Sequence, residues 1–189
     1  MEILHWYWIP IIYLIRRFYI KNAPMNSHDI DQRKSYIYFS IGEENFAIIV
    51  NRVLEILHHE QLTHVPNASD YIKGILNFRG AIVPIINLPK RFNFAQHESE
   101  SKMVIVVEIV HQDNHVPMGL LVDEVTDVIE IEYKDIRSVP EIGIKYNPDF
   151  LEGFIEIQGK FIMVLDVDRV LSVPELAEIR EVTDNQLSV

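Results

Sequence analysis

Hydrophobic and polar residues alternate along most of the chain after residue 35. Ile37, Phe39 and Ile41 open the pattern, FAIIV (46–50) continues it after a turn, and MVIVVEIV (103–110) is apolar enough to be a buried strand. Successive side chains of a β-strand point to opposite faces, so this period of two predicts strands. Many short strands separated by turn signals predict a mainly β fold built from small barrels.

Residues 52–57 alternate in the same way. The pattern places Leu54 and Ile56 on one face of the expected strand and Val53 and Glu55 on the other. An outward valine beside a glutamate is typical of a contact surface. Coverage by the first barrel is the alternative, and the spacing leaves both interpretations open.

Two segments 79 residues apart repeat one pattern without a gap, YIKGILNFRGAIVPIINL (71–88) and FLEGFIEIQGKFIMVLDV (150–167). A second pair, VNRVLEI (50–56) and VDEVTDV (122–128), repeats at an offset of 72. The chain therefore predicts two halves built on one plan.

Each copy of the longer repeat predicts a β-hairpin whose tight turn has glycine in its second position, where a positive φ is required. Arg79 lies at the tip of the first hairpin, beside Gly80, where the second copy has the neutral Gln158. A solvated turn arginine without a function is the alternative to a binding role. Pro84 in the return strand predicts an edge strand or a bulge, because proline cannot donate to a ladder.

Short helices are expected before both hairpins. Asn67 can cap a helix over 68–73 that ends at Gly74. Pro148 suits the first position of a matching turn that ends at Gly153.

Three regions are expected along the chain. Residues 1–35 are an apolar extension followed by a polar linker, and residues 36–172 form the main domain, with approximate halves 36–95 and 102–172. Residues 173–189 contain a C-terminal helix, PELAEIREV, and a tail.

The first 20 residues differ from the rest of the chain. Residues 3–15 are mostly aromatic and β-branched, and this run is shorter than a spanning helix requires. Arg16 and Arg17 follow it, whereas a signal peptide has its basic residues before the apolar run. We interpret this extension as the result of a start codon assigned too early. A membrane tether and an extra strand are the alternatives.

Composition excludes several functions. The chain has 17 basic and 28 acidic residues, a formal net charge of −11, so a phosphate-binding surface for nucleic acid is not expected. The absence of cysteine removes disulfides, thiolate metal sites and cysteine nucleophiles. The sequence contains no P-loop, no GxGxxG dinucleotide-binding motif and no GxSxG nucleophile motif. We therefore predict no catalytic residue, no cofactor and no small-molecule substrate. A serine–histidine–acid triad stays an open alternative, because its members cannot be paired by sequence distance.

Two polar clusters have residue types that could form a site. His58, His59, Glu60 and His64 have ligand types that suit zinc, but solvated loop histidines are the favoured interpretation. Asp166 and Asp168 could act as an acid–base pair, but they are interpreted as residues that end the last strand and cap the following turn.

The repeat also carries a family resemblance. YIKGILNFRGAIVPIINL is similar to the CheW signature IKGxxNxRGxIVPxxDLR, and YFSIGEENFAIIVNRVLEI resembles the opening strands of that family. MGLLVDEVTDV and FLEGFIEIQGKFIMVLDV match its later elements. The resemblance covers about residues 36–172.

The resemblance implies two linked five-stranded SH3-like β-barrels with a few short helices, and no catalysis. It implies a cytoplasmic adaptor at receptor arrays that binds the regulatory domain of a CheA-type histidine kinase and the cytoplasmic tip of chemoreceptors. By motif position, the receptor site between the barrels would include Val53, Glu55, Asn77, Arg79 and Gly80.

Two departures from the family pattern leave the pathway open. Asn87, Leu88 and Pro89 replace the family's DLR and lose a charge pair, and His58-His59 replaces a basic–glycine pair. An adaptor of a type IV pilus pathway is therefore the alternative within the class. A histidine-ligated metalloenzyme is the alternative from another class.

Overall fold

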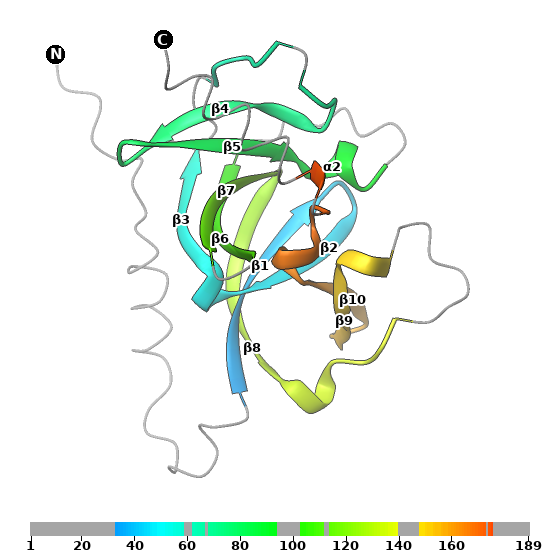
Figure 1. Cartoon of the computed structure of the whole chain (residues 1–189). Helices are drawn as coiled ribbons and strands as arrows, with labels where there is room; N and C mark the ends of the chain where they lie inside the picture. The colour runs from blue at the N-terminus through cyan, green and yellow to red at the C-terminus, as the bar shows by residue number, and fades with distance from the viewer. Residues whose placement is uncertain are drawn as a thin grey trace, which may run out of the picture.

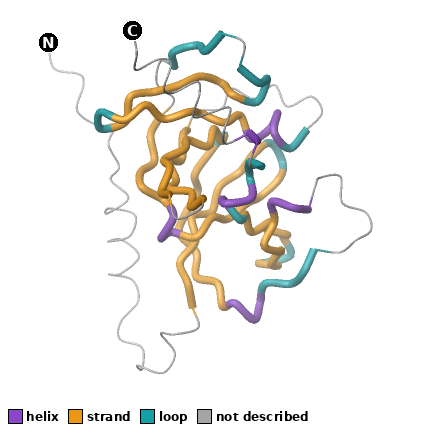
Figure 2. The backbone as a smooth tube through the Cα atoms, viewed as in Figure 1, coloured by secondary structure: helices purple, strands orange, loops and turns teal. Residues whose placement is uncertain are grey.

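The chain folds into two five-stranded β-sheets with very short helices between them (Figures 1 and 2). The computed structural model describes residues 33–58, 62–66, 68–93, 103–111, 114–139, 148–172 and 174–175.

The first sheet has the strand order β8-β1-β2-β10-β9. Its strands are β1 (Arg33–Ile41), β2 (Glu44–Ile49), β8 (Glu124–Glu132), β9 (Leu151–Ile157) and β10 (Lys160–Leu165). The second sheet has the order β3-β6-β7-β5-β4. Its strands are β3 (Val53–His58), β4 (Ile72–Phe78), β5 (Ala81–Asn87), β6 (Met103–His111) and β7 (Asn114–Val122).

One α-helix and four 3₁₀ turns join the strands of the described chain. They are η1 (Val50–Arg52), α2 (Leu88–Arg91), η2 (Tyr133–Asp135), η3 (Pro148–Phe150) and η4 (Val167–Arg169). Because η1 follows β2 and precedes β3, it is the point where the chain crosses from the first sheet to the second.

The two sheets follow the same plan. In each, an antiparallel hairpin (β1–β2 or β6–β7) has an edge strand on one side and a parallel partner on the other. The parallel pairs are β2–β10 and β7–β5, and β9 and β4 complete the sheets. The mainly β prediction and its two five-stranded units are confirmed.

Neither sheet is formed by one half of the sequence. The hairpin β1–β2, from the first half, lies between β8 and β10 of the second half, and β6–β7 lies between β3 and β5. The halves therefore exchange hairpins, which a linear repeat does not reveal. Each sheet is open, because no ladder joins its two edge strands within the described residues.

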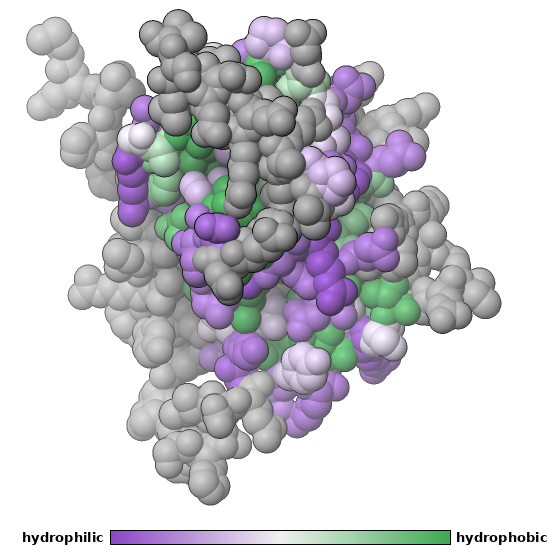
Figure 3. Space-filling view, viewed as in Figure 1, coloured by the Kyte–Doolittle hydropathy of each residue, from purple (hydrophilic) through white to green (hydrophobic). Residues whose placement is uncertain are grey.

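Three hydrophobic clusters hold the sheets. One lies in the first sheet around Tyr36, Ala47 and Ile155, and one in the second sheet around Val83, Val104 and Val106. The largest takes buried residues from both sheets, including the stacked rings of Phe39 and Phe46, 5.6 Å apart. Burial of about 25 cal/mol per Å² of apolar surface makes this shared cluster the main attraction between the sheets. Figure 3 shows hydrophilic residues across one face of the molecule, with smaller hydrophobic areas between them.

The prediction that Gly74 and Gly153 end helical turns is wrong. Gly74 lies inside β4 and Gly153 inside β9. A Cβ on Gly74 would lie 2.6 Å from the Thr63 carbonyl oxygen, and one on Gly153 2.4 Å from the Arg137 carbonyl oxygen. Each glycine therefore lets a second chain segment cross its strand closely.

The crossing segments are held by matching bridges. Thr63 exchanges two backbone hydrogen bonds of 2.9 Å with Ile75, and Arg137 exchanges two of 2.9 Å with Phe154. The expected helix over 68–73 is wrong because its end forms β4, while Pro148 does begin the 3₁₀ turn η3.

Pro84 lies in β5, which has partners on both sides. Pairing with β7 begins only at Ile85, so Pro84 has its ladder partner, Ile75, on the β4 side alone. The predicted edge position is therefore wrong for β5. The bulge that was its alternative has support, because the β4–β5 ladder shifts register between Ile72 and Gly74, next to the pair Ile75–Pro84. At Pro84 itself no N–H is needed on the β7 side.

The chain ends lie mostly outside the described residues. Residues 1–32 are not described, so the N-terminal expectations stay predictions, and of the expected C-terminal helix only Pro174 and Glu175 are described, both helical. No helix in the described part of the chain is long and apolar enough to cross a membrane.

The chain that follows η4 contacts α2 through Val170 and Glu175. Arg91 donates to the Val170 carbonyl oxygen at 2.9 Å and lies 3.1 Å from a Glu175 carboxylate oxygen. Burial acts to raise the pKa of Glu175, but hydrogen bonds from Ser172 and the Arg91 charge hold it below its usual value.

Candidate protein-interaction site

The β4–β5 hairpin ends in a two-residue turn in which both residues have positive φ. Arg79 has φ 54° and Gly80 has φ 88°, the combination of a type I′ turn, whose twist matches that of paired strands. The Gly80 N–H donates to the Asn77 Oδ1 at 2.9 Å. Asn77 and Gly80 therefore fix the turn that presents Arg79.

The Arg79 side chain reaches out of this turn toward β3. Its Nη2 lies 2.7 Å from the Glu55 Oε2, and its guanidinium carbon lies 5.0 Å from the centre of the Phe78 ring. The Arg79 side chain is 73% exposed and that of Glu55 only 13%, so the cation is the accessible member of the pair. Because β3 and β4 are the two edges of the second sheet, this contact brings the tip of the β4–β5 hairpin to the opposite edge (Figure 1).

The orientation of β3 differs from the predicted alternation. Val53 pairs with Val107 and Glu55 with Val106, so Leu54 is an extra residue in a β-bulge. Val53 and Ile56 both pack against the shared cluster, whereas Leu54 is 38% exposed. The predicted faces, with Leu54 beside Ile56, are therefore wrong, because one inserted residue shifts the alternation.

The structure brings four of the five predicted site residues together. Glu55, Asn77, Arg79 and Gly80 are linked by the contacts above, while the partly buried Val53 lies two residues from Glu55 and faces the core. Leu54 was missed as a surface residue, because bulges have no signal in a period of two.

The second hairpin has the same backbone without the ion pair. Gln158 has φ 52° and Gly159 φ 75°, which repeats the turn of Arg79 and Gly80. Asp127, the repeat counterpart of Glu55, accepts from the neighbouring Val128 N–H at 2.8 Å. The arginine–carboxylate contact therefore distinguishes one hairpin from the other.

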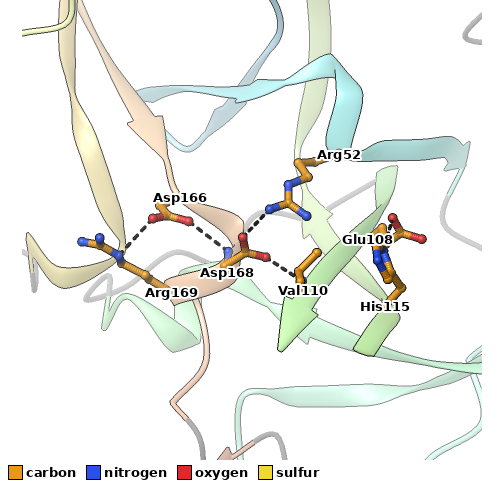
Figure 4. A network of polar contacts seen from close by, with 7 residues as sticks. All are labelled: Arg52, Glu108, Val110, His115, Asp166, Asp168 and Arg169. Carbon is orange, nitrogen blue, oxygen red and sulfur yellow. Dashed lines mark hydrogen bonds and ion pairs between the residues drawn. The ribbon is translucent and has the colours of Figure 1, made fainter. Parts of the chain in front are cut away.

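A polar network joins the two sheets near the start of β3 (Figure 4). The Asp166 Oδ1 accepts from the Asp168 N–H at 3.1 Å, which confirms Asp166 as a cap. Asp168, however, is not a cap: its Oδ1 accepts from the Val110 N–H at 2.7 Å and its Oδ2 pairs with Arg52. The predicted shared capping role is thus wrong for Asp168, because its partners are remote in sequence.

The other candidate clusters have less support. His58 and His64 are described, but His59 and Glu60 lie outside the described residues, and no group of three potential metal ligands occurs among the residues that are described. Asn87, at the departure from the family's DLR, accepts from the Lys90 N–H at 3.0 Å and caps α2, with Pro89 in the first turn.

The paired sheets and repeated hairpins define a class of small β-proteins built from two similar five-stranded units. Within that class, the family model of the CheW-like domain matches residues 35–175. The chain belongs to this family.

Named relatives agree with this assignment. The chain is 33% identical over 144 residues to the chemotaxis protein CheW of Klebsiella aerogenes, covering 76% of this chain and 85% of the relative. It is 31% identical over 144 residues to the chemotaxis protein CheW of Bacillus subtilis, covering 76% and 90%. The crystal structure of the scaffolding protein TtCheW from Thermoanaerobacter tengcongensis is 29% identical, with a TM-score of 0.68, and the match covers 82% of this chain and 93% of that one.

Proposed function

We propose that this chain is a non-enzymatic adaptor of a bacterial chemosensory pathway. It couples the cytoplasmic tip of chemoreceptors to the regulatory domain of a CheA-type histidine kinase, at receptor arrays on the inner face of the membrane. Membership of the CheW-like family supports the adaptor role, as do relatives named chemotaxis proteins and a solved relative described as a scaffolding protein.

The receptor-binding site is formed by Val53, Glu55, Asn77, Arg79 and Gly80. The observation that carries this proposal is the exposed Arg79 guanidinium, held by Glu55 at the end of the β4–β5 hairpin. A guanidinium offers five donors in a fixed fork, which suits carboxylates and carbonyl oxygens of a receptor helix. Asn77 and Gly80 shape the turn, and Val53 anchors β3 to the core.

Reconstitution tests the adaptor function directly. The chain, a chemoreceptor signalling fragment and a CheA-type kinase from the same organism are mixed, and kinase autophosphorylation is measured. We expect the chain to raise autophosphorylation only when receptor and kinase are both present. Unchanged receptor-coupled kinase activity would contradict the proposal.

Two variations of the assay separate the alternatives. Receptors of a type IV pilus pathway replace the flagellar receptors in a parallel series, and the receptor that couples identifies the pathway. Metal analysis of the purified chain tests the metalloenzyme alternative, which requires stoichiometric zinc.

A further inference from the structure

Asp168 connects three parts of the molecule that are distant in sequence. It lies in η4, directly after β10 of the first sheet, and its two carboxylate oxygens face different partners. One accepts from the Val110 N–H of β6 in the second sheet, and the other pairs with Arg52 in η1, the crossover between the sheets. Figure 4 shows Asp168 between these two partners.

The position of Val110 explains why a carboxylate is needed there. The ladder between β3 and β6 ends at the pair Val53–Val107, so Val110 lies beyond the reach of β3. Asp168 accepts the Val110 N–H in place of a neighbouring strand. The carboxylate therefore occupies the open side of β6 three residues beyond Val107, the partner of the first residue of β3.

Arg52 fixes the other side of the same point. It is the last residue of η1 and directly precedes Val53, the first residue of β3. Both side chains of the pair are largely covered, with 27% of Arg52 and 30% of Asp168 exposed. Ion pairs that are partly removed from water, and hydrogen-bonded on a second side, restrain geometry more than exposed pairs do.

The network is absent from the other half of the repeat. At the offset of 72, Arg52 corresponds to Glu124, and at the offset of 79, Asp168 corresponds to Pro89, so the counterparts cannot form this pair. The network is therefore present at the start of β3, the strand that carries Glu55, and absent at the start of β8, the counterpart of β3.

We propose that Arg52 and Asp168 are positioning residues for the receptor site. Their contact sets where β3 leaves the crossover, and so holds the bulged segment at the angle that brings Glu55 to Arg79. This inference rests on the proposed receptor-binding function, but it assigns a role to two residues outside the site itself.

The test uses variants that remove the contact with little change in volume. Asp168→Asn keeps an oxygen for the Val110 N–H and removes the charge toward Arg52, and Arg52→Gln removes the cation. Arg52→Lys is the conservative variant. Arg169→Gln is the matched control in the same turn, because the Arg169 side chain is 66% exposed and its ion pair is with the nearby Asp166, not with Asp168.

Affinity for a receptor signalling fragment and for the kinase regulatory domain is measured for each full-length variant. We expect Asp168→Asn and Arg52→Gln each to weaken receptor binding at least about threefold, with no further loss in the double variant, because coupled residues are non-additive. Arg52→Lys should retain most of the affinity, and kinase binding and Arg169→Gln should match wild type. Full additivity, or normal receptor binding with a lowered melting temperature, would overturn the inference.

A second measurement needs no receptor. Amide hydrogen exchange of residues 53–58 should become faster in Asp168→Asn and stay unchanged in Arg169→Gln. Unchanged exchange in Asp168→Asn would overturn the positioning role, whether or not wild type binds a receptor. A wild-type protein that binds no receptor would instead contradict the proposed function. If Arg79→Ala weakens receptor binding and Asp168→Asn does not, the function stands and the positioning role fails.

Discussion

Arg79 occupies a backbone conformation that a non-glycine residue adopts at a cost of about 1–2 kcal/mol. Gln158 has the same conformation in the other hairpin, so the strain belongs to the type I′ turn and not to the site. What distinguishes Arg79 is its side chain, which contacts Glu55 and the Phe78 ring while most of it stays exposed. A substitution that keeps Cβ therefore separates the side chain's role from that of the turn.

Arg79→Ala should weaken receptor binding at least tenfold, because truncation of an interface hot spot typically costs about 2 kcal/mol or more. The melting temperature should stay within about 2 °C, since an exposed ion pair contributes only about 0.2–1 kcal/mol. Kinase affinity should be nearly unchanged. Titration against both partners and a thermal melt measure all three.

Gln158→Ala is the control for this experiment, because it makes the same change at the same turn position with φ near 50°. It should leave receptor affinity at the wild-type level. Equal losses of receptor affinity in the two variants would show that the receptor binds the turn and not the guanidinium.

Tyr36 gives the residue scale a pH-dependent test. It is 2% exposed, and burial, followed by the charges of Glu152 and Tyr133, raises its pKa to about 12 from 10.0. The neutral phenol is therefore favoured in the folded state. Its contribution to stability is complete below pH 10 and is lost as the pH rises through about 12.

Tyr36→Phe should flatten the loss of stability above pH 10. Wild type should lose up to about 2 kcal/mol more than the variant between pH 10 and 12, since one pKa unit corresponds to about 1.4 kcal/mol. Urea unfolding at several pH values measures the difference. Parallel stability curves would show that the phenol titrates alike in both states.

At the scale of the elements, the repeated glycines show what a sequence can and cannot reveal. The hairpins and their glycine-containing turns were predictable, because tight turns have local chemistry. Gly74 and Gly153 were misinterpreted as helix ends, because the reason for each is a chain segment that crosses it, Thr63 in one case and Arg137 in the other. Nothing adjacent in sequence identifies such a crossing.

The candidate site divides in the same way. The motif singled out Arg79 and Glu55, and the structure places them in contact. The bulge at Leu54 and the tie between Asp168 and Arg52 were not predictable, since the first adds a residue without changing composition and the second joins positions 116 residues apart.

Gly153→Ala should be strongly destabilising, by about 2 kcal/mol or more, because its Cβ would meet the Arg137 carbonyl oxygen at 2.4 Å and backbone would have to move. Gly159→Ala is the comparison. Its Cβ would meet nothing within 4 Å, so the cost should be only the φ of 75°, about 1 kcal/mol. Denaturant unfolding measures both, and a Gly153→Ala protein as stable as Gly159→Ala would refute the close crossing.

At the scale of the whole molecule, the described fold begins at Arg33, and the ladder between β1 and β8 already extends to the last residue of β8. β1 therefore already has a partner in β8 from its first residue onward. Deleting residues 2–24 should leave the melting temperature and kinase binding close to wild type. Loss of folding would show that this apolar segment completes a sheet, whereas lost function in a folded protein, restored by a foreign anchor, would identify a tether.

The exchange of hairpins between the two halves also sets an order for biosynthesis. Ribosomes deliver the chain from its N-terminus at about 5–20 residues per second. The second sheet has all its strands once Val122 has emerged, but the first must wait for β10, which ends at Leu165. β1 gains its neighbour β8 at Glu132, but β2 has no neighbour on its other side until β10 emerges, and an unpaired edge of this kind invites pairing with other chains. The nascent protein is therefore most exposed to aggregation and to chaperone binding through the free edge of β2, at a stage when every strand of the second sheet has already been made.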